Sequence, residues 1–250
     1  SNTDSSHQRP IDHLAILKQS SEHFAEPAMQ SDAVPLKPQR VMAEVAKVLP
    51  EDAVVVTDIG NNLTWVERNL MVRRPDTLVS FAGLAAMGSG VAAAVGAKLA
   101  AGDRPVVAIC GDGDFQMHGM EVMTAVNHRV PVVWLILDNS RLAMIHDVQT
   151  MSYQSRHVAS TFQNPDFVAL GEAFGAVGLR AEQPDEIAPS LARALSSDRP
   201  AILAVPIDPE EMPPAKPRML AMERSMGLPS LKDSVSRGAA KALLGMFRER

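Results

Sequence analysis

The stretches Cys110-Gly111-Asp112-Gly113-Asp114-Phe115 and Leu137-Asp138-Asn139-Ser140-Arg141-Leu142 decide the fold of this chain. They predict a buried strand, a tight glycine turn, a helix, a second strand and then a polar loop. Asp112 and Asn139 therefore follow the carboxyl ends of two parallel strands, the edge at which open α/β sheets bind ligands. Their carboxylate and amide oxygens are hard donors that suit Mg²⁺ or Ca²⁺ held against phosphates. Because the glycines let backbone N–H groups come close, the sequence predicts a cation and phosphate site here.

Strands and helices alternate along most of the chain. Buried strands are expected at residues 53–57, 77–81, 105–110, 131–137 and 201–207. Helices are expected at residues 39–49, through 65–70, up to about 101, and at 119–127, 165–174 and 185–195. This alternation predicts a doubly wound α/β fold, in which helices cover both faces of a parallel sheet.

The chain is expected to have three parts. Residues 1–34 are polar, with short helical periodicity only at 11–18, and are interpreted as a linker or docking arm. Residues 35–208 are expected to form the α/β domain. Residues 209–250 are rich in Pro and Met and are interpreted as a lid or tail that ends in a short helix at 239–247.

Composition excludes several classes of protein. The net charge is −5 and no long basic run occurs, which disfavours nucleic acid and anionic membranes as partners. Cys110 is the only cysteine, so an internal disulfide and a cysteine-held iron–sulfur cluster are excluded. No segment has the pattern of a membrane-spanning helix, and no signal peptide opens the sequence. We therefore expect a cytoplasmic protein.

Four further motifs accompany the Gly-Asp-Gly turn: Leu36-Lys37-Pro38-Gln39, Asp58-Ile59-Gly60-Asn61-Asn62, Gly83-Leu84-Ala85-Ala86-Met87-Gly88 and Asn164-Pro165-Asp166-Phe167. Asn139 also follows Asp112 by 27 residues. In this order and at this spacing, residues 35 to about 207 resemble the diphosphate-binding domain of thiamine-diphosphate-dependent enzymes of the acetolactate synthase and pyruvate decarboxylase group. The resemblance implies thiamine diphosphate and Mg²⁺ as cofactors and a small 2-oxo acid as substrate.

The resemblance also assigns roles to individual residues. It implies Mg²⁺ ligands from the side chains of Asp112 and Asn139 and from the main-chain carbonyl of Arg141. The cofactor-binding residues that it implies are Gly60, Asn61, Asn62, Gly83, Met87, Gly111, Gly113, Asp114 and Met144. The Met87 side chain is expected to sit beneath the cofactor and keep it bent.

Three departures from the family pattern stand out, at Asp114, at Ala143 together with Ala85-Ala86, which stand in place of Gly-Thr, and at Val148. Asp114 stands where the family usually has Ser, so its carboxylate is expected to point away from the diphosphate or to be offset by charge. Ala143 replaces a usual Gly, and Val148 replaces an aromatic that often narrows the substrate channel. The metal and diphosphate predictions survive these changes, whereas decarboxylation and acetolactate-type carboligation both stay open.

The activating glutamate of the family lies on a separate pyrimidine-binding domain, and neither Glu44 nor Glu67 matches its motif. We therefore expect half of an active site. A partner subunit would supply the other half, most simply in an α₂β₂ heterotetramer. The alternative is that these residues are a fragment of a longer polypeptide.

His118 follows the diphosphate turn and is the one catalytic candidate in the chain, able to donate to a substrate carboxylate or to relay protons. A structural role at a helix end is the alternative interpretation. A second class of function, a non-catalytic scaffold that keeps the fold, would have been favoured by loss of Asp112 or Asn139, and both are present.

Overall fold

The computed structural model describes residues 26–214. The chain divides into two compact units after Glu211, and the sheet and every named helix belong to the first. The helical segments expected at residues 11–18 and 239–247 lie outside the described residues.

Six parallel strands form a single sheet in the order β2-β1-β3-β4-β6-β5. The strands are β1 (Val54–Thr57), β2 (Leu78–Ser80), β3 (Val106–Gly111), β4 (Val133–Asp138), β5 (Val177–Arg180) and β6 (Ala201–Pro206). The helices are η2 (Pro27–Gln30), α2 (Pro38–Val48), α3 (Asn61–Asn69), α4 (Ser89–Ala101), α5 (Asp112–His118), α6 (Glu121–His128), α7 (Ala143–Ser152), α8 (Phe167–Phe174) and α9 (Pro184–Leu195).

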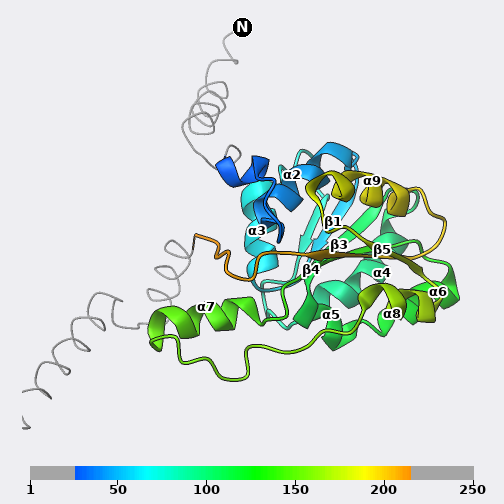
Figure 1. Cartoon of the computed structure of the whole chain (residues 1–250). Helices are drawn as coiled ribbons and strands as arrows, with labels where there is room; N and C mark the ends of the chain where they lie inside the picture. The colour runs from blue at the N-terminus through cyan, green and yellow to red at the C-terminus, as the bar shows by residue number, and fades with distance from the viewer. Residues whose placement is uncertain (1–25, 215–250) are drawn as a thin grey trace, which may run out of the picture. The chain divides into compact units, whose positions relative to one another are not determined.

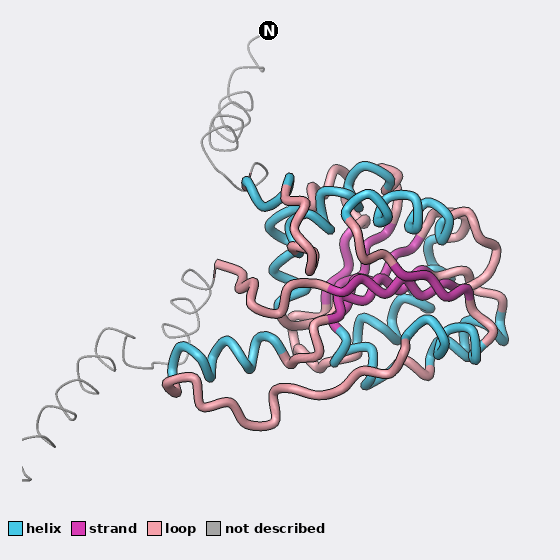
Figure 2. The backbone as a smooth tube through the Cα atoms, in the orientation of Figure 1, coloured by secondary structure: helices cyan, strands magenta, loops and turns pink. Residues whose placement is uncertain are grey.

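Helices cover both faces of the sheet because alternate strand residues point to opposite sides. On one face, Val107, Ile109 and Leu135 pack with residues of α2, α3 and α9. On the other, Ala108 and Trp134 pack with residues of α4, α5, α6 and α8. Figure 1 shows these two helix layers, and Figure 2 shows the strands as the layer between them. The prediction of a doubly wound α/β fold is confirmed.

Four elements of the structure were not predicted. η2 lies in the segment interpreted as a linker or docking arm, and α5 covers residues 112–118, where a tight glycine turn was expected before a helix at 119–127. β5 is a short strand, Val-Gly-Leu-Arg, that pairs only with β6 at the edge of the sheet. α7 contributes no residue to either core, and it extends away from the sheet beyond the covering helices (Figure 1). β5 and α7 lack the length or the apolar periodicity from which a strand or a helix could be predicted.

The strands are all parallel, but the order in which the chain adds them to the sheet changes direction between β1 and β3. From β1 it passes through α3, on one face, to β2, whereas from β3 it passes through α5 and α6, on the other face, to β4. The segments that follow β1 and β3 therefore diverge at the carboxyl edge, the position at which such sheets bind ligands. Residues 58–61 and 111–114 lie at this point, since Thr57 pairs with Ile109.

The first and last segments of the folded unit lie side by side. Leu36 forms a parallel bridge with Ile207, and its carbonyl accepts from Asp208 N–H at 2.8 Å. The Lys37 ammonium reaches both Asp208 and Glu211, each at 2.7 Å. The two segments are thereby fastened together. Within residues 26–214, no helix is both long and apolar enough to cross a bilayer.

Candidate functional site

Asp112 begins α5 directly after β3, and only 2% of it is exposed. Its Oδ1 accepts from Gly113 N–H at 2.7 Å. Its Oδ2 accepts from three donors, Asn139 N–H at 3.1 Å, Ser140 N–H at 2.5 Å and the Asn164 side-chain amide at 2.7 Å. The carboxylate thus joins the start of α5 to the loop that follows β4.

Burial raises the pKa of Asp112 to about 6. Hydrogen bonds from Asn164, Gly113 and Ser140 act in the opposite direction, and the nearby charge of Asp138 adds to the rise. Within residues 26–214 no cationic side chain pairs with Asp112, and two carboxylates close together form an electrostatic setting that suits a divalent cation.

The oxygen atoms available at and around Asp112 are also suitable ligands for a cation. A carboxylate oxygen offers two lone-pair sites, so Oδ2 with three donors is saturated while Oδ1 with one donor retains capacity. Within the described residues, no hydrogen bond engages the Asn139 side-chain amide. The Arg141 guanidinium is turned to the Pro209 carbonyl and Glu210. No three His, Cys, Asp or Glu side chains gather at one point in residues 26–214, so any cation here would also need amide, main-chain or phosphate oxygens.

Asp114, the residue that departs from the family pattern, turns its side chain back to accept from Gly111 N–H at 2.9 Å. Burial, followed by the charges of Asp58 and Asp112, raises its pKa to about 8. At neutral pH the Asp114 carboxyl is therefore largely neutral, which reduces the repulsion that its charge would impose on a phosphate.

Asp58 is a third buried carboxylate at this edge, and it anchors the start of α4. Its Oδ1 accepts from Gly88 N–H at 2.9 Å and its Oδ2 from Val91 N–H at 3.0 Å. These bonds satisfy N–H groups in the first turn of α4 that have no partner within the helix. Asp58 thereby ties the loop after β1 to the Met87-Gly88 turn.

The predicted phosphate loop, residues 60–62, opens α3. Gly60 has φ +113°, a conformation that favours glycine. The Asn61 side-chain amide donates to Asp147 of α7 at 2.8 Å, and the Asn62 amide donates to the Ile109 carbonyl at 3.3 Å. Asn61 therefore faces α7 and Asn62 faces the sheet, and their contacts to a phosphate stay predictions.

The Gly83–Gly88 segment lies over the diphosphate turn. A Cβ added at Gly113 would lie 2.7 Å from Leu142 Cδ2 and 3.2 Å from Met87 Cε, so only glycine allows both side chains to pack so closely. Gly83 is exposed at the outer end of the segment, and Met144 is half-buried in α7. The structure places the end of the Met87 side chain near Gly113 of the turn that begins with Asp112, and its contact with the cofactor stays a prediction.

His118 ends α5 and is exposed. A Cβ added at Gly88, whose φ is +85°, would lie 2.2 Å from His118 Nδ1. His118 therefore borders the Met87-Gly88 turn, close to the residues predicted to meet the aminopyrimidine.

Three residues of this edge were missed as site residues. Asn164 and Asp138 surround Asp112, and Asp147 accepts from Asn61. Asn164 lies on a loop without periodicity, and Asp147 lies on a helix whose only buried residue it is. Two signals were available, because Asn164 opens the Asn164-Pro165-Asp166-Phe167 motif and Asp138 ends a strand beside Asn139.

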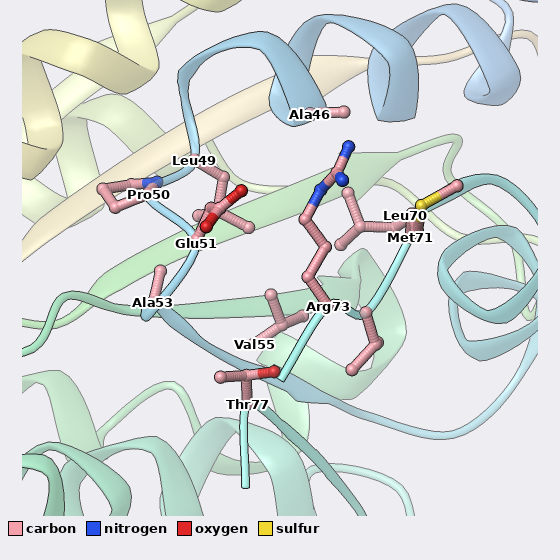
Figure 3. Close-up of a pocket in the computed structure, with 11 residues that line it drawn as sticks. Ala46, Leu49, Pro50, Glu51, Ala53, Val55, Leu70, Met71, Arg73 and Thr77 are labelled. Carbon is pink, nitrogen blue, oxygen red and sulfur yellow. The ribbon is translucent and has the colours of Figure 1, made fainter. Parts of the chain in front are cut away.

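A separate hollow lies at the opposite edge, near the amino end of β1 (Figure 3). It is bordered by apolar side chains that include Leu49, Val55 and Leu70, with Arg73 across it and Thr77 at its base. It shares no residue with the Asp112 edge.

Comparisons with known proteins agree with this arrangement. Residues 58–205 match the family described as thiamine pyrophosphate enzyme, C-terminal TPP binding domain. The chain is 35% identical over 205 residues to a probable acetolactate synthase large subunit of Methanococcus aeolicus, covering 80% of this chain and 34% of that protein. It is 38% identical over 160 residues to the acetolactate synthase isozyme 2 large subunit of Escherichia coli K12, covering 64% and 29%.

A solved structure, the benzoylformate decarboxylase of Polynucleobacter necessarius, superposes with a TM-score of 0.66 at 26% identity, covering 72% of this chain and 35% of that one. The chain thus spans about a third of the length of the relatives that it matches.

Proposed function

The chain belongs to the C-terminal thiamine-pyrophosphate-binding domain family of thiamine pyrophosphate enzymes, and we propose that its Asp112 edge holds Mg²⁺ and the diphosphate of that cofactor. The observation that carries the proposal is the environment of Asp112, a buried carboxylate with one oxygen still able to accept, which is bonded to the main chain of Asn139, a residue whose side-chain amide has no hydrogen bond within residues 26–214. The side chains of Asp112 and Asn139 and the carbonyl of Arg141 would hold the cation. The amides of residues 111–114 and the loop at residues 60–62 would hold the diphosphate.

When bound, thiamine diphosphate supplies the nucleophilic carbon that adds to the carbonyl of a 2-oxo acid. The residues of this chain would orient the cofactor and keep water from it. Met87, which already packs on Gly113, would support the cofactor rings from below. Gly83 and Met144 would complete that pocket, and His118, beside Gly88, would donate to the substrate carboxylate.

We further propose that the reaction is decarboxylation of a 2-oxo acid, carboligation of the acetolactate type, or both. A pyrimidine-binding partner subunit would supply the activating glutamate, most simply in an α₂β₂ assembly. The names of several relatives, acetolactate synthase large subunit and benzoylformate decarboxylase, support this range of reactions. Residues 1–34 would serve as a linker or docking arm and residues 209–250 as a lid or tail, in a cytoplasmic enzyme.

Calorimetry of thiamine diphosphate binding tests the assignment. The full chain, alone and with its partner, should bind the cofactor in the presence of Mg²⁺ and lose that binding in EDTA. Asp112→Ala should abolish binding, because the diphosphate loses its bridging cation. The Asp103→Ala variant, which removes an exposed carboxylate after α4, is the matched control and should bind normally. Unchanged binding by Asp112→Ala would refute the site, and a chain that never binds the cofactor would favour the scaffold alternative.

A further inference from the structure

Asn164 contacts both carboxylates at the end of the cofactor edge. Its side-chain amide donates to Asp112 Oδ2 at 2.7 Å and to Asp138 Oδ1 at 2.6 Å, and it lies 3.4 Å from the Ser140 hydroxyl. Its carbonyl oxygen accepts from the Gln116 amide at 2.8 Å. One side chain therefore joins the start of α5, the end of β4 and the loop before α8.

The chemistry of an asparagine amide matches these neighbours. An NH₂ group has two hydrogens, and the two shortest contacts go to two carboxylates that can only accept when ionised. The opposite orientation of the amide would point an oxygen at both carboxylates and lose both bonds. The electrostatics of the site therefore determine which way the group points.

We propose that Asn164 is a positioning residue for the metal ion, holding Asp112 so that Oδ1 faces the cation while Oδ2 is kept occupied. This inference rests on the proposed function. With Asn139 N–H and Ser140 N–H, the Asn164 amide completes the three donors on Oδ2. It also occupies Asp138, so that the second carboxylate does not compete with Asp112 for the cation.

The loop that carries Asn164 is itself fixed to the metal loop. Leu142 N–H donates to the Ser160 carbonyl at 3.0 Å, and Phe162 N–H donates to the Ser140 carbonyl at 3.1 Å. This short antiparallel bridge holds the backbone on both sides of Arg141. Asn164 thus lies on a segment that is hydrogen-bonded to the loop of the predicted ligands Asn139 and Arg141.

Mg²⁺ titrations at saturating thiamine diphosphate, followed by calorimetry on the full chain with its partner, test the proposal. Asn164→Ala should weaken Mg²⁺ binding by about 10–100-fold, the usual effect of removing a group that orients a metal ligand. Asn164→Gln, which keeps the amide but displaces it by a methylene, should weaken binding as well, and it serves if the alanine variant does not fold. Melting temperatures without ligands are recorded for each variant.

Two further variants separate positioning from simple structural support. Gln116→Ala removes only the bond on the carbonyl side of Asn164 and should leave Mg²⁺ affinity within about threefold of wild type. Asp138→Asn added to Asn164→Ala should recover part of the lost affinity, because it removes the like charge beside Asp112 and supplies a donor.

Wild-type Mg²⁺ affinity in both Asn164 variants would overturn the inference. So would a loss that Gln116→Ala reproduces and Asp138→Asn does not relieve, since that pattern reports general loosening of the loops. If the wild-type chain itself shows no Mg²⁺-dependent cofactor binding, the proposed function fails first, and that outcome is distinct from the other two.

Discussion

Three buried carboxyl groups, those of Asp58, Asp112 and Asp114, meet at one edge of this sheet. Among residues 26–214, Asp58 and Asp112 each accept from several N–H groups, whereas Asp114 accepts from Gly111 alone. Ionisation of Asp114 therefore receives the least compensation, and this difference has a measurable consequence for stability.

The folded chain should lose stability as the pH rises from about 4 to about 8. The pKa of Asp114 is about 8 in the folded state, raised mainly by burial, while that of an unfolded Asp is about 3.9. Between these values the folded state binds more protons than the unfolded state, so each rise in pH favours unfolding. Asp114→Asn should therefore gain on the order of a few kcal/mol at pH 9 and little at pH 4.

Urea unfolding of the metal-free chain at pH 5, 7 and 9 measures this difference. Asp103→Asn, at an exposed position, is the control and should follow the wild-type curve. Parallel pH profiles for the wild type and Asp114→Asn would contradict the assignment of a protonated Asp114.

Met87 is expected to serve the cofactor more than the core. It is half-buried and belongs to neither core cluster, so Met87→Ala should cost no more than about 1–2 kcal/mol of unfolding free energy, at or below the low end for core truncations. Activity of the complete enzyme should fall much further, because the support beneath the cofactor is lost. A variant that unfolds readily, yet whose folded fraction keeps full activity, would place Met87 in the core instead.

The sequence predicted the meeting of Asp112 and Asn139 because strand ends of a parallel sheet share an edge, a rule that needs only strand positions. It did not predict Asn164 or Asp147. Both reach the site from segments after β4 whose path depends on tertiary contacts, and no local period marks them. The orientation of Asp114 was left as two alternatives, and the structure shows its side chain turned to Gly111.

At the scale of elements, α7 differs from the helices that cover the sheet. Asp147 is its only buried residue, and its carboxylate accepts from Asn61 of α3. Burial raises the pKa of Asp147, and the Asn61 bond opposes that rise. Since no apolar side chain of α7 joins a core, this polar contact is a main link between α7 and the rest of the unit.

Asp147→Ala should loosen α7 without destabilising the sheet. Removing the bond leaves α7 with few buried contacts, so local opening should become easier while global unfolding changes little. Hydrogen exchange followed by mass spectrometry should show faster exchange in residues 143–152 and unchanged protection in β3 and β4. Val148→Ala, at an exposed position of the same helix, should change neither; equal exchange in α7 of the wild type and Asp147→Ala would show that other contacts hold it.

Apart from α5, whose residues 112–118 were expected to form a turn, the covering helices and the central strands were predictable because they have strong apolar patterns, and their observed bounds differ from the expected ones by a few residues at most. β5 and α7 were not, because β5 contains Gly178 and only four residues, and α7 carries no stripe that a core would require. β5 forms because it pairs with β6, and contacts of single polar residues position α7.

For the whole molecule, activity is expected only in an assembly. The isolated chain should show no 2-oxo acid decarboxylation, even with saturating thiamine diphosphate and Mg²⁺, because the activating glutamate is expected on a pyrimidine-binding partner. Adding that partner should restore turnover, and a glutamate-to-glutamine change in it should remove turnover again. Robust turnover by the purified chain alone would require an activating acid among its own residues.

The bridge between Leu36 and Ile207 makes this unit a candidate for circular permutation, in which two neighbouring segments are linked and new ends are opened elsewhere. A short linker from Asp208 to Leu36 could close the backbone into a loop, since the two segments already hydrogen-bond. New ends could then be opened at Gly102 and Asp103, an exposed turn remote from the Asp112 edge. A circularly permuted chain of this kind would keep every strand neighbour. Because its new ends would be consecutive residues, the permuted unit could also be inserted at one position of another polypeptide, with the cofactor edge left uncovered.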